Sequence, residues 1–139
     1  MTITEQKAAQ RKAGIAARRA LSDTERTSSN AALCACIAAL DCFKKAENIL
    51  LYAAFGGEAD LSTLAVEAAR QGKTLAYPVC GEGFSLTAAV PGPDGWEVGT
   101  YGIRTPILSR SAVLPPDKLD LVLVPCTAFD ADCFRVGMG

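Results

Sequence analysis

The segment from Asp120 to Gly139 constrains the fold of this chain more than any other. It reads D-L-V-L-V-P-C-T-A-F-D-A-D-C-F-R-V-G-M-G. An apolar run of strand length, 120–124, leads into a proline, an acidic turn and then Arg135 among spaced glycines. This order predicts a buried strand whose carboxyl end opens onto an anion-binding loop, because α/β sheets bind ligands beyond the carboxyl ends of their strands. The chain ends within the glycines, so we expect the loop to be incomplete.

Upstream of this segment, helix-like and strand-like stretches alternate. The predicted helices are 4–20, capped by Thr4, then Asp23 to about Phe43 behind a Ser22–Glu25 capping box, and Asp60 or Ser62 to about Gln71. The predicted strands are 48–53, 74–79 with a break at Pro78, a weaker 84–90, and 120–124. Residues 91–118 are rich in Pro and Gly and are expected to form a surface excursion with one short element near Ile103. We therefore predict one α/β domain over 1–139, a Rossmann-like three-layer sandwich with a mostly parallel sheet and helices on both faces.

Composition excludes several kinds of site. With 139 residues the chain suits one domain, and with no histidine it cannot use Ser-His-Asp or Cys-His catalysis or a His-containing zinc site. A net charge of -1 argues against nucleic acid as a partner, and no apolar run approaches the ~20 residues of a membrane span. Six cysteines without a C-x-x-C pair are read as buried free thiols in a reducing cytoplasm, with disulfides as the alternative.

A basic stripe lies on the first predicted helix. Lys7, Arg11 and Arg18 follow spacings of four and seven residues, which puts them on one face. Such a stripe can grip a polyphosphate. A solvated helix face is the plainer interpretation, and a membrane-surface helix is disfavoured because the other face is mostly alanine.

Two loops at predicted strand ends add further candidates. In F-G-G-E-A-D, 55–60, Glu58 can accept hydrogen bonds from the amino groups of a heterocycle, or can simply belong to a turn. In the terminal loop, Arg135 with Gly137 and Gly139 can form a backbone nest for phosphate, or an ordinary glycine turn. Because both loops leave the carboxyl ends of strands, we expect Glu58 and Arg135 to face one crevice.

Other residues are given a structural interpretation first. Asp130 and Asp132 could approach a magnesium ion, but a turn is favoured for them. Trp96 and Tyr101 could stack on a planar ligand, although pinning the 91–118 excursion to the body of the domain is favoured.

Taken in order, the sequence blocks resemble a known family. They are K-x-x-x-R (Lys7 and Arg11), R-A-L-S-D-T-E-R (19–26), Y-A-A-F-G-G-E-A-D (52–60), G-K-T-L-A-Y-P (72–78), G-T-Y-G-I-R-T-P (99–106) and D-L-V-L-V-P…F-D…R-V-G-M-G (120–139). The series resembles the 5-formyltetrahydrofolate cyclo-ligase family, also called methenyltetrahydrofolate synthetase. The resemblance implies ATP, magnesium and conversion of 5-formyltetrahydrofolate to 5,10-methenyltetrahydrofolate with release of ADP and phosphate.

The resemblance also implies roles for individual residues. Lys7, Arg11, Arg135, Gly137 and Gly139 are expected to bind ATP, with Arg135 also catalytic. Folate is expected at Glu58 and Phe55. No metal-binding residue is expected in this chain, because the family's magnesium-binding aspartate comes later in its sequence, and weak or no turnover follows.

The resemblance is not complete, and other functions stay open. Cys126 and Cys133 stand where glycines are usual in the family, and Thr105 stands where a glutamate is usual. Cys133 would strain the turn if that turn needs a positive φ.

We expect a cytoplasmic monomer that acts on a small molecule. The alternatives are a non-catalytic nucleotide- or phosphate-binding module, and an interaction domain docking through its basic N-terminal helix.

Overall fold

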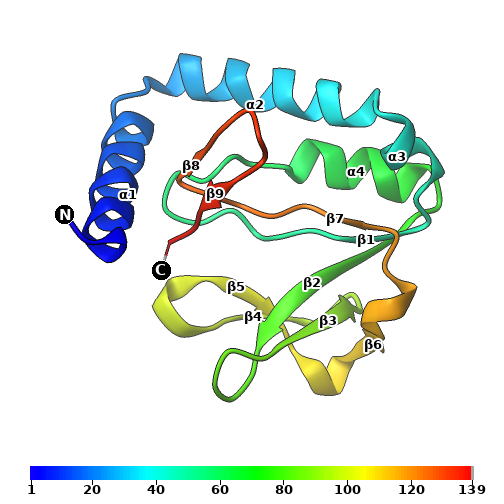
Figure 1. Cartoon of the computed structure of the whole chain (residues 1–139). Coiled ribbons are helices and arrows are strands. Elements are labelled where there is room, and N and C mark those ends of the chain that lie inside the picture. The colour runs from blue at the N-terminus through cyan, green and yellow to red at the C-terminus, as the bar shows by residue number, and fades with distance from the viewer. Residues whose placement is uncertain (139) are drawn as a thin grey trace.

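A computed structural model describes residues 1–138, so the predicted role of Gly139 lies outside the described residues. The helices are α1 (Ile3–Arg19), α2 (Asp23–Ala38), α3 (Asp41–Lys45) and α4 (Ser62–Arg70). The strands are β1 (Asn48–Leu50), β2 (Thr74–Cys80), β3 (Leu86–Pro91), β4 (Trp96–Val98), β5 (Arg104–Pro106), β6 (Ser111–Leu114), β7 (Leu121–Val122), β8 (Ala128–Phe129) and β9 (Arg135–Val136). The fold is mixed α/β, as Figure 1 shows.

The main sheet has five strands in the order β6-β3-β2-β1-β7. β1 is parallel to both β2 and β7, whereas β2–β3 and β3–β6 are antiparallel. The expected mostly parallel, Rossmann-like sheet is therefore not confirmed. The parallel β1–β2 pair follows from the crossover through α4, and the antiparallel half arises because β2 enters β3 through a short turn with no helix between them.

Pro78 does not end its strand, contrary to the expectation. β2 pairs with β1 only as far as Ala76 and pairs with β3 from Tyr77 onward, with Pro78 opposite Ala88. A proline lacks the N–H that would bond to a strand on its other side. Because β2 no longer pairs with β1 at this point, the missing N–H breaks no pairing and the strand continues through Pro78.

The prediction that residues 91–118 form a surface excursion with one short element is wrong. These residues hold β4 and β5, which pair as a hairpin, and β6, which extends the main sheet. The hairpin turns at Tyr101 and Gly102, both with positive φ. Three-residue strands separated by Pro and Gly carry too little periodicity to be seen in sequence.

The helix boundaries follow local capping. The capping box of Ser22 and Glu25 is confirmed at the start of α2. A second box, Thr2 with Glu5, starts α1, so the cap expected at Thr4 is wrong by two positions. The single helix expected from Asp23 to about Phe43 is also wrong, because Leu40 is extended and separates α2 from α3.

The hydrophobic core lies between α2, α3, α4 and one face of the central strands. Its buried residues are Cys34, Phe43, Ala46, Ile49, Leu51, Leu61, Leu64 and Ala68. On β7 and the residues after it, Leu121 and Leu123 pack against this core, while the alternating Val122 and Val124 are 47% and 48% exposed. The last predicted strand is thus an edge strand covered on one side. The helices expected on both faces are not confirmed for the described residues.

Cysteine placement also differs from expectation. Only Cys34 is buried, although all six thiols are unpaired as expected. No helix among residues 1–138 is both long and apolar enough to cross a lipid bilayer.

Candidate functional site

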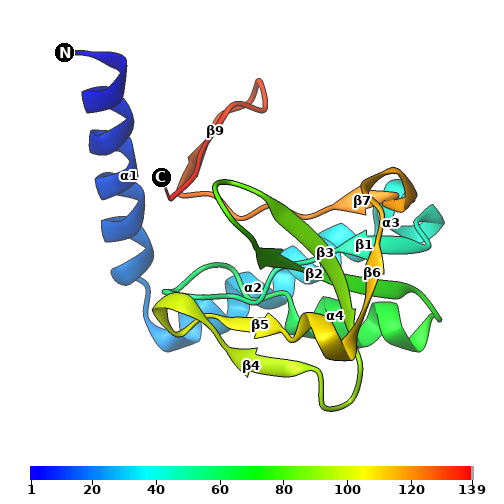
Figure 2. The same cartoon turned by 90° about the horizontal axis from the view of Figure 1, so that it is seen from below.

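A cavity of about 660 Å³ opens between α1 and the β8–β9 hairpin, and we call it the basic cavity. Figures 1 and 2 both show α1 standing away from the main sheet with β9 beside it. The cavity is lined by Ile3, Gln6, Lys7, Gln10, Ala13, Gly14, Ala128, Phe129, Asp130, Phe134, Arg135 and Val136. Lys7 and Arg135, from opposite ends of the chain, therefore face the same space.

The basic stripe of α1 binds the C-terminal segment directly. Arg11 Nε donates to the carbonyl oxygen of Gly137 at 2.8 Å, and Arg18 Nη2 donates to that of Cys126 at 2.9 Å. Both arginines are half-buried. The interpretation of the stripe as a solvated face is therefore wrong for these two residues, and the helix is fixed to the loops after β7 and β9.

Gly14 permits this close approach and was not among the predicted site residues. A Cβ built on Gly14 would overlap the carbonyl oxygen of Thr127. Thr127 is itself held by hydrogen bonds between its N–H and Oγ1 and the Val136 oxygen, at 2.7 and 2.9 Å. The signal in the sequence was one glycine inside an alanine-rich helix, which often marks a packing contact.

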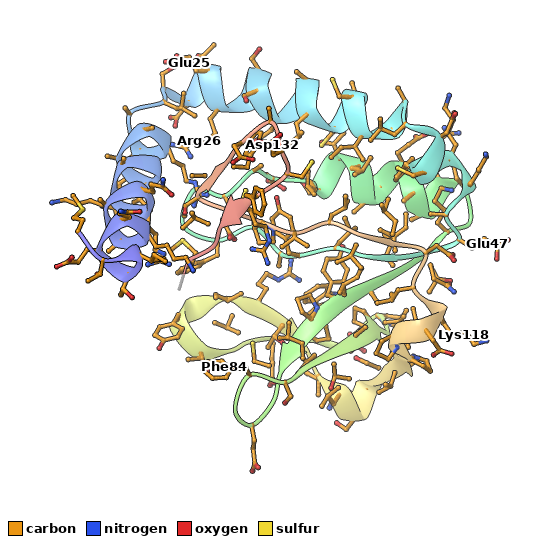
Figure 3. All side chains as sticks on the ribbon, viewed as in Figure 1. Glu25, Arg26, Glu47, Phe84, Lys118 and Asp132 are labelled. Atoms are coloured by element: carbon orange, nitrogen blue, oxygen red, sulfur yellow. The ribbon has the colours of Figure 1, made fainter. Side chains whose placement is uncertain are left out.

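The hairpin turn explains the acidic residues of the C-terminal segment. Asp130 Oδ1 accepts from the N–H groups of Asp132 and Phe134, at 2.9 and 3.0 Å, so Asp130 shapes the turn. Asp132 is exposed at its tip (Figure 3). Cys133 has a φ of 68°, the left-handed conformation in which the sequence analysis expected strain. The favoured turn interpretation of Asp130 is confirmed.

The 55–60 loop packs beside α1 but does not line the basic cavity. Glu58 Oε1 accepts from the Phe55 N–H at 2.9 Å, which shapes the loop as the plainer interpretation proposed. Phe55 is 40% exposed. The structure therefore does not place Glu58 and Arg135 in the same cavity, and the folate-binding roles of Glu58 and Phe55 stay predictions.

Arginines connect this loop to the rest of the site. Arg26, labelled in Figure 3 near the α1–α2 corner, donates to the carbonyl oxygens of Gly57 and Arg18, at 3.4 and 3.2 Å.

Tyr52 supports the same loop from the end of β1. Burial raises the pKa of Tyr52 to about 12, and the negative charge of Glu58 is the next largest cause. The Tyr52 hydroxyl donates to the Ala59 oxygen at 2.8 Å. Tyr52 is thus a neutral, fixed support for the loop.

The cations of the site have no acidic partners within residues 1–138. The one ion pair recorded for residues 1–138 joins Arg70 and Glu67 on α4, and neither residue lines the basic cavity. The same residues contain no group of three or more Cys, Asp or Glu side chains that could hold a metal ion. Lys7 and Arg135 outnumber Asp130, the one carboxylate among the described residues that line the cavity, so the cavity keeps a net positive charge, which favours an anionic ligand.

Trp96 and Tyr101 behave differently from each other. The Trp96 ring packs edge-on against Tyr77 with centroids 4.7 Å apart, which fixes the β4–β5 hairpin to β2. Tyr101, at the hairpin tip, is 83% exposed. The expectation that these aromatics pin the excursion is confirmed for Trp96 and wrong for Tyr101.

Comparison with known proteins identifies the class to which this α/β domain belongs. The model of the 5-formyltetrahydrofolate cyclo-ligase family matches residues 3–139. A curated 5-formyltetrahydrofolate cyclo-ligase from Haemophilus influenzae is 31% identical over 99 residues, which cover 69% of this chain and 53% of that protein. This chain thus spans about half the length of that curated relative.

Two solved structures share the fold. The 5,10-methenyltetrahydrofolate synthetase of Aquifex aeolicus has a TM-score of 0.82 at 31% identity, covering 96% of this chain and 67% of that one. A synthetase of the same name from Mycoplasma pneumoniae has a TM-score of 0.74 at 19% identity, covering 96% and 71%. The chain belongs to the 5-formyltetrahydrofolate cyclo-ligase family.

Proposed function

We propose that this chain binds ATP and 5-formyltetrahydrofolate as part of an enzyme that forms 5,10-methenyltetrahydrofolate with release of ADP and phosphate. The observation that carries the proposal is the basic cavity, where Lys7 and Arg135 meet although 128 positions separate them in the sequence. The family to which the chain belongs supports the choice of substrates.

The nucleotide is assigned to the basic cavity on chemical grounds. Lys7 would act as a point charge and Arg135 as a planar fork for phosphate oxygens. Phe129 and Phe134 are 79% and 74% exposed and line the same cavity, so they offer rings for an adenine. A volume of about 660 Å³ lies within the roughly 300–1,000 Å³ typical of small-molecule sites.

Arg11 and Gly137 do not line the basic cavity, although their chain neighbours Gln10 and Val136 do, and they are assigned a supporting part beside it. The Arg11 guanidinium uses Nε for the Gly137 carbonyl, which leaves its terminal nitrogens for phosphate. The contact also fixes the backbone after β9 against α1, so the donors that would meet the phosphates are positioned before ligand arrives.

Bound ATP would supply the phosphoryl group that makes the formyl oxygen a good leaving group. The chain's own contribution is to hold and neutralise charge, which needs no histidine. Magnesium is part of the proposal only as a companion of the phosphates, because residues 1–138 offer no carboxylate cluster for it.

The folate is assigned to the 55–60 loop. Glu58 Oε1 is used within the loop, while Oε2 has no hydrogen-bond partner among the described residues and is available to a heterocyclic amino group. Phe55, 40% exposed, would contact the pterin ring. A cytoplasmic monomer completes the proposal, and size-exclusion chromatography with light scattering checks the oligomeric state.

Calorimetry tests the two binding reactions separately. Lys7→Ala and Arg135→Ala should each weaken Mg-ATP about tenfold or more, because each removes a charge-assisted contact to phosphate. Glu58→Gln should weaken 5-formyltetrahydrofolate and leave Mg-ATP unchanged. Lys45→Ala on α3 is the matched control, since it removes a positive charge outside the cavity.

Other outcomes would reassign the chain. Mg-ATP binding with no folate binding would indicate the nucleotide-binding module. If neither ligand binds, the enzyme assignment of this chain is wrong, and an interaction domain docking through α1 becomes the better description.

A further inference from the structure

A second cavity, of about 260 Å³, lies between the end of β1, the start of α4 and the β4–β5 hairpin, and we call it the aromatic cavity. It is lined by Leu51, Tyr52, Ala53, Ala54, Asp60, Leu61, Ser62, Ala65, Tyr77, Trp96 and Arg104. None of the residues assigned above to ATP or to the pterin lines it. Its volume is below the roughly 300 Å³ of the smaller drug-sized sites, so it has room for one ring with a short substituent and not for a whole folate.

The wall of this cavity combines an aromatic face with a free cation. The Arg104 guanidinium carbon lies 4.7 Å from the centroid of the Trp96 ring, and the same ring packs edge-on against Tyr77. Within residues 1–138, Arg104 makes no side-chain hydrogen bond and has no carboxylate within 4.0 Å. A guanidinium stacked on an aromatic ring keeps its N–H edge directed outward, where it can bind a carboxylate through two hydrogen bonds.

The register of the hairpin places these side chains together. Trp96 is opposite Pro106 and Val98 is opposite Arg104, so all four share one face of the β4–β5 pair. Pro106 on that face is fully buried, which fixes the hairpin on the domain. Trp96 and Arg104 are therefore presented from a rigid support and not from a mobile loop.

The loop that carries the pterin-binding candidates also forms the cavity. Ala53 and Ala54 enter the lining from one side of the loop, and Asp60 and Leu61 return to it on the other. Phe55 and Glu58 lie between them in sequence. The loop therefore joins the pterin-binding candidates to the lining of the cavity along the chain.

One acidic side chain lines the cavity and must be accounted for. Asp60 Oδ1 accepts from the Ser62 N–H at 2.9 Å, which directs its charge at the first turn of α4. The Tyr52 hydroxyl is likewise used, because it donates to the Ala59 oxygen at 2.8 Å. Arg104 is thus the charged lining group without a partner among the described residues, and it favours an anion. The Tyr77 and Ser62 hydroxyls also line the cavity and can add neutral hydrogen bonds.

We propose that the aromatic cavity binds the 4-aminobenzoyl-glutamate portion of the folate, with the benzoyl ring on Trp96 and a glutamate carboxylate on Arg104. The inference rests on the proposed function and extends it from the pterin to the tail of the substrate. An aromatic ring joined to a carboxylate by a short amide matches the size, apolar wall and single cation of the cavity.

The single tryptophan of the chain makes a direct test possible. Protein labelled with 5-fluorotryptophan gives one ¹⁹F resonance, from Trp96, and its shift is followed while 4-aminobenzoyl-L-glutamate is added. We expect a saturable shift, whereas 4-aminobenzamide, which lacks the carboxylates, should cause a much weaker one. Arg104→Gln should lower the affinity for 4-aminobenzoyl-L-glutamate at least about tenfold, since it removes a charge-assisted bidentate contact. The affinity of Arg104→Lys should lie between those of the wild type and Arg104→Gln, because lysine keeps the charge but not the fork.

Controls separate this proposal from the one it rests on. Arg110→Gln removes the same charge outside the cavity and should leave the titration unchanged. No saturable shift, or equal affinity in wild type and Arg104→Gln, overturns the subsite. If Arg104→Gln alone lacks any effect while Mg-ATP and 5-formyltetrahydrofolate bind in calorimetry, the proposed function stands without it. If neither of those ligands binds, the proposed function fails and takes the subsite with it.

Discussion

Arg11 and Gly137 are joined by a hydrogen bond of 2.8 Å although 126 positions separate them in sequence. The bond ties the middle of α1 to the backbone after β9, next to residues that line the basic cavity, although neither Arg11 nor Gly137 lines it. Arg11→Ala should therefore weaken Mg-ATP about tenfold or more, because it removes both a cation and the contact that holds the loop. Isothermal calorimetry measures the loss. Lys12→Ala removes an exposed neighbouring residue of equal charge and should change the affinity for Mg-ATP little. Equal losses of affinity in the two variants would mean that Arg11 acts only through general electrostatic attraction.

Gly14→Ala should destabilise the protein although it improves a helix. Intrinsic helix propensity alone favours alanine by about 1 kcal/mol. Here the new Cβ would overlap the Thr127 carbonyl oxygen, so α1 must move away from the β8–β9 hairpin. Urea unfolding followed by circular dichroism gives the net effect, and Ala17→Gly on an exposed site of the same helix calibrates the propensity. A more stable Gly14→Ala protein would show that α1 is not held closely at this point.

Cys133→Gly should stabilise the hairpin. Cys133 has a φ of 68°, and a left-handed conformation costs a non-glycine residue roughly 1–2 kcal/mol. Glycine removes that strain but gains freedom in the unfolded chain, so we expect a net gain of about 0.5–1 kcal/mol. Thermal unfolding reports the change. Cys133→Ala keeps the strain while removing the thiol, and a gain there equal to that of glycine would contradict the argument.

Asp120 should make stability depend on acid pH. The N–H groups of Asn48 and Glu47 donate to its Oδ2 at 2.9 and 3.0 Å, and these bonds hold the pKa of the carboxyl below its usual value. The folded pKa is lower than the unfolded pKa, so the contribution is complete above the unfolded value, near pH 4, and is lost as pH falls through the folded one.

Asp120→Asn should therefore lower the free energy of unfolding at neutral pH. The gap between variant and wild type should narrow as pH falls below about 4. Urea titrations across that range measure it, with Asp117→Asn as an exposed control. A gap that stays constant with pH would mean that the charge of Asp120 is not what joins the start of β7 to β1.

The site could be predicted in part because its signals are local. The spacing of Lys7, Arg11 and Arg18 places them on one helix face whatever the helix packs against. The strained turn at Cys133 was predicted from the family resemblance, because a glycine is usual at that position. Which surface that helix face meets was not readable, because it depends on where the hairpin after β7 folds back.

The aromatic cavity was not predicted, for a different reason, although Trp96 was considered as a residue that could stack on a ligand. Trp96 and Arg104 come from three-residue strands in a Pro- and Gly-rich stretch, where periodicity is too short to register. Their importance arises only when the hairpin docks on β2 and Trp96 meets Tyr77.

By itself the sequence determined the capping box that starts α2, the parallel β1–α4–β2 unit and the family, because capping, helical spacing and ordered motifs act over a few neighbouring residues. Tertiary structure alone decided that the sheet is mixed, that β7 keeps one side exposed, and that Glu58 and Arg135 line different parts of the molecule. These outcomes depend on pairings between segments dozens of residues apart, whose free energies come from packing that no local pattern encodes.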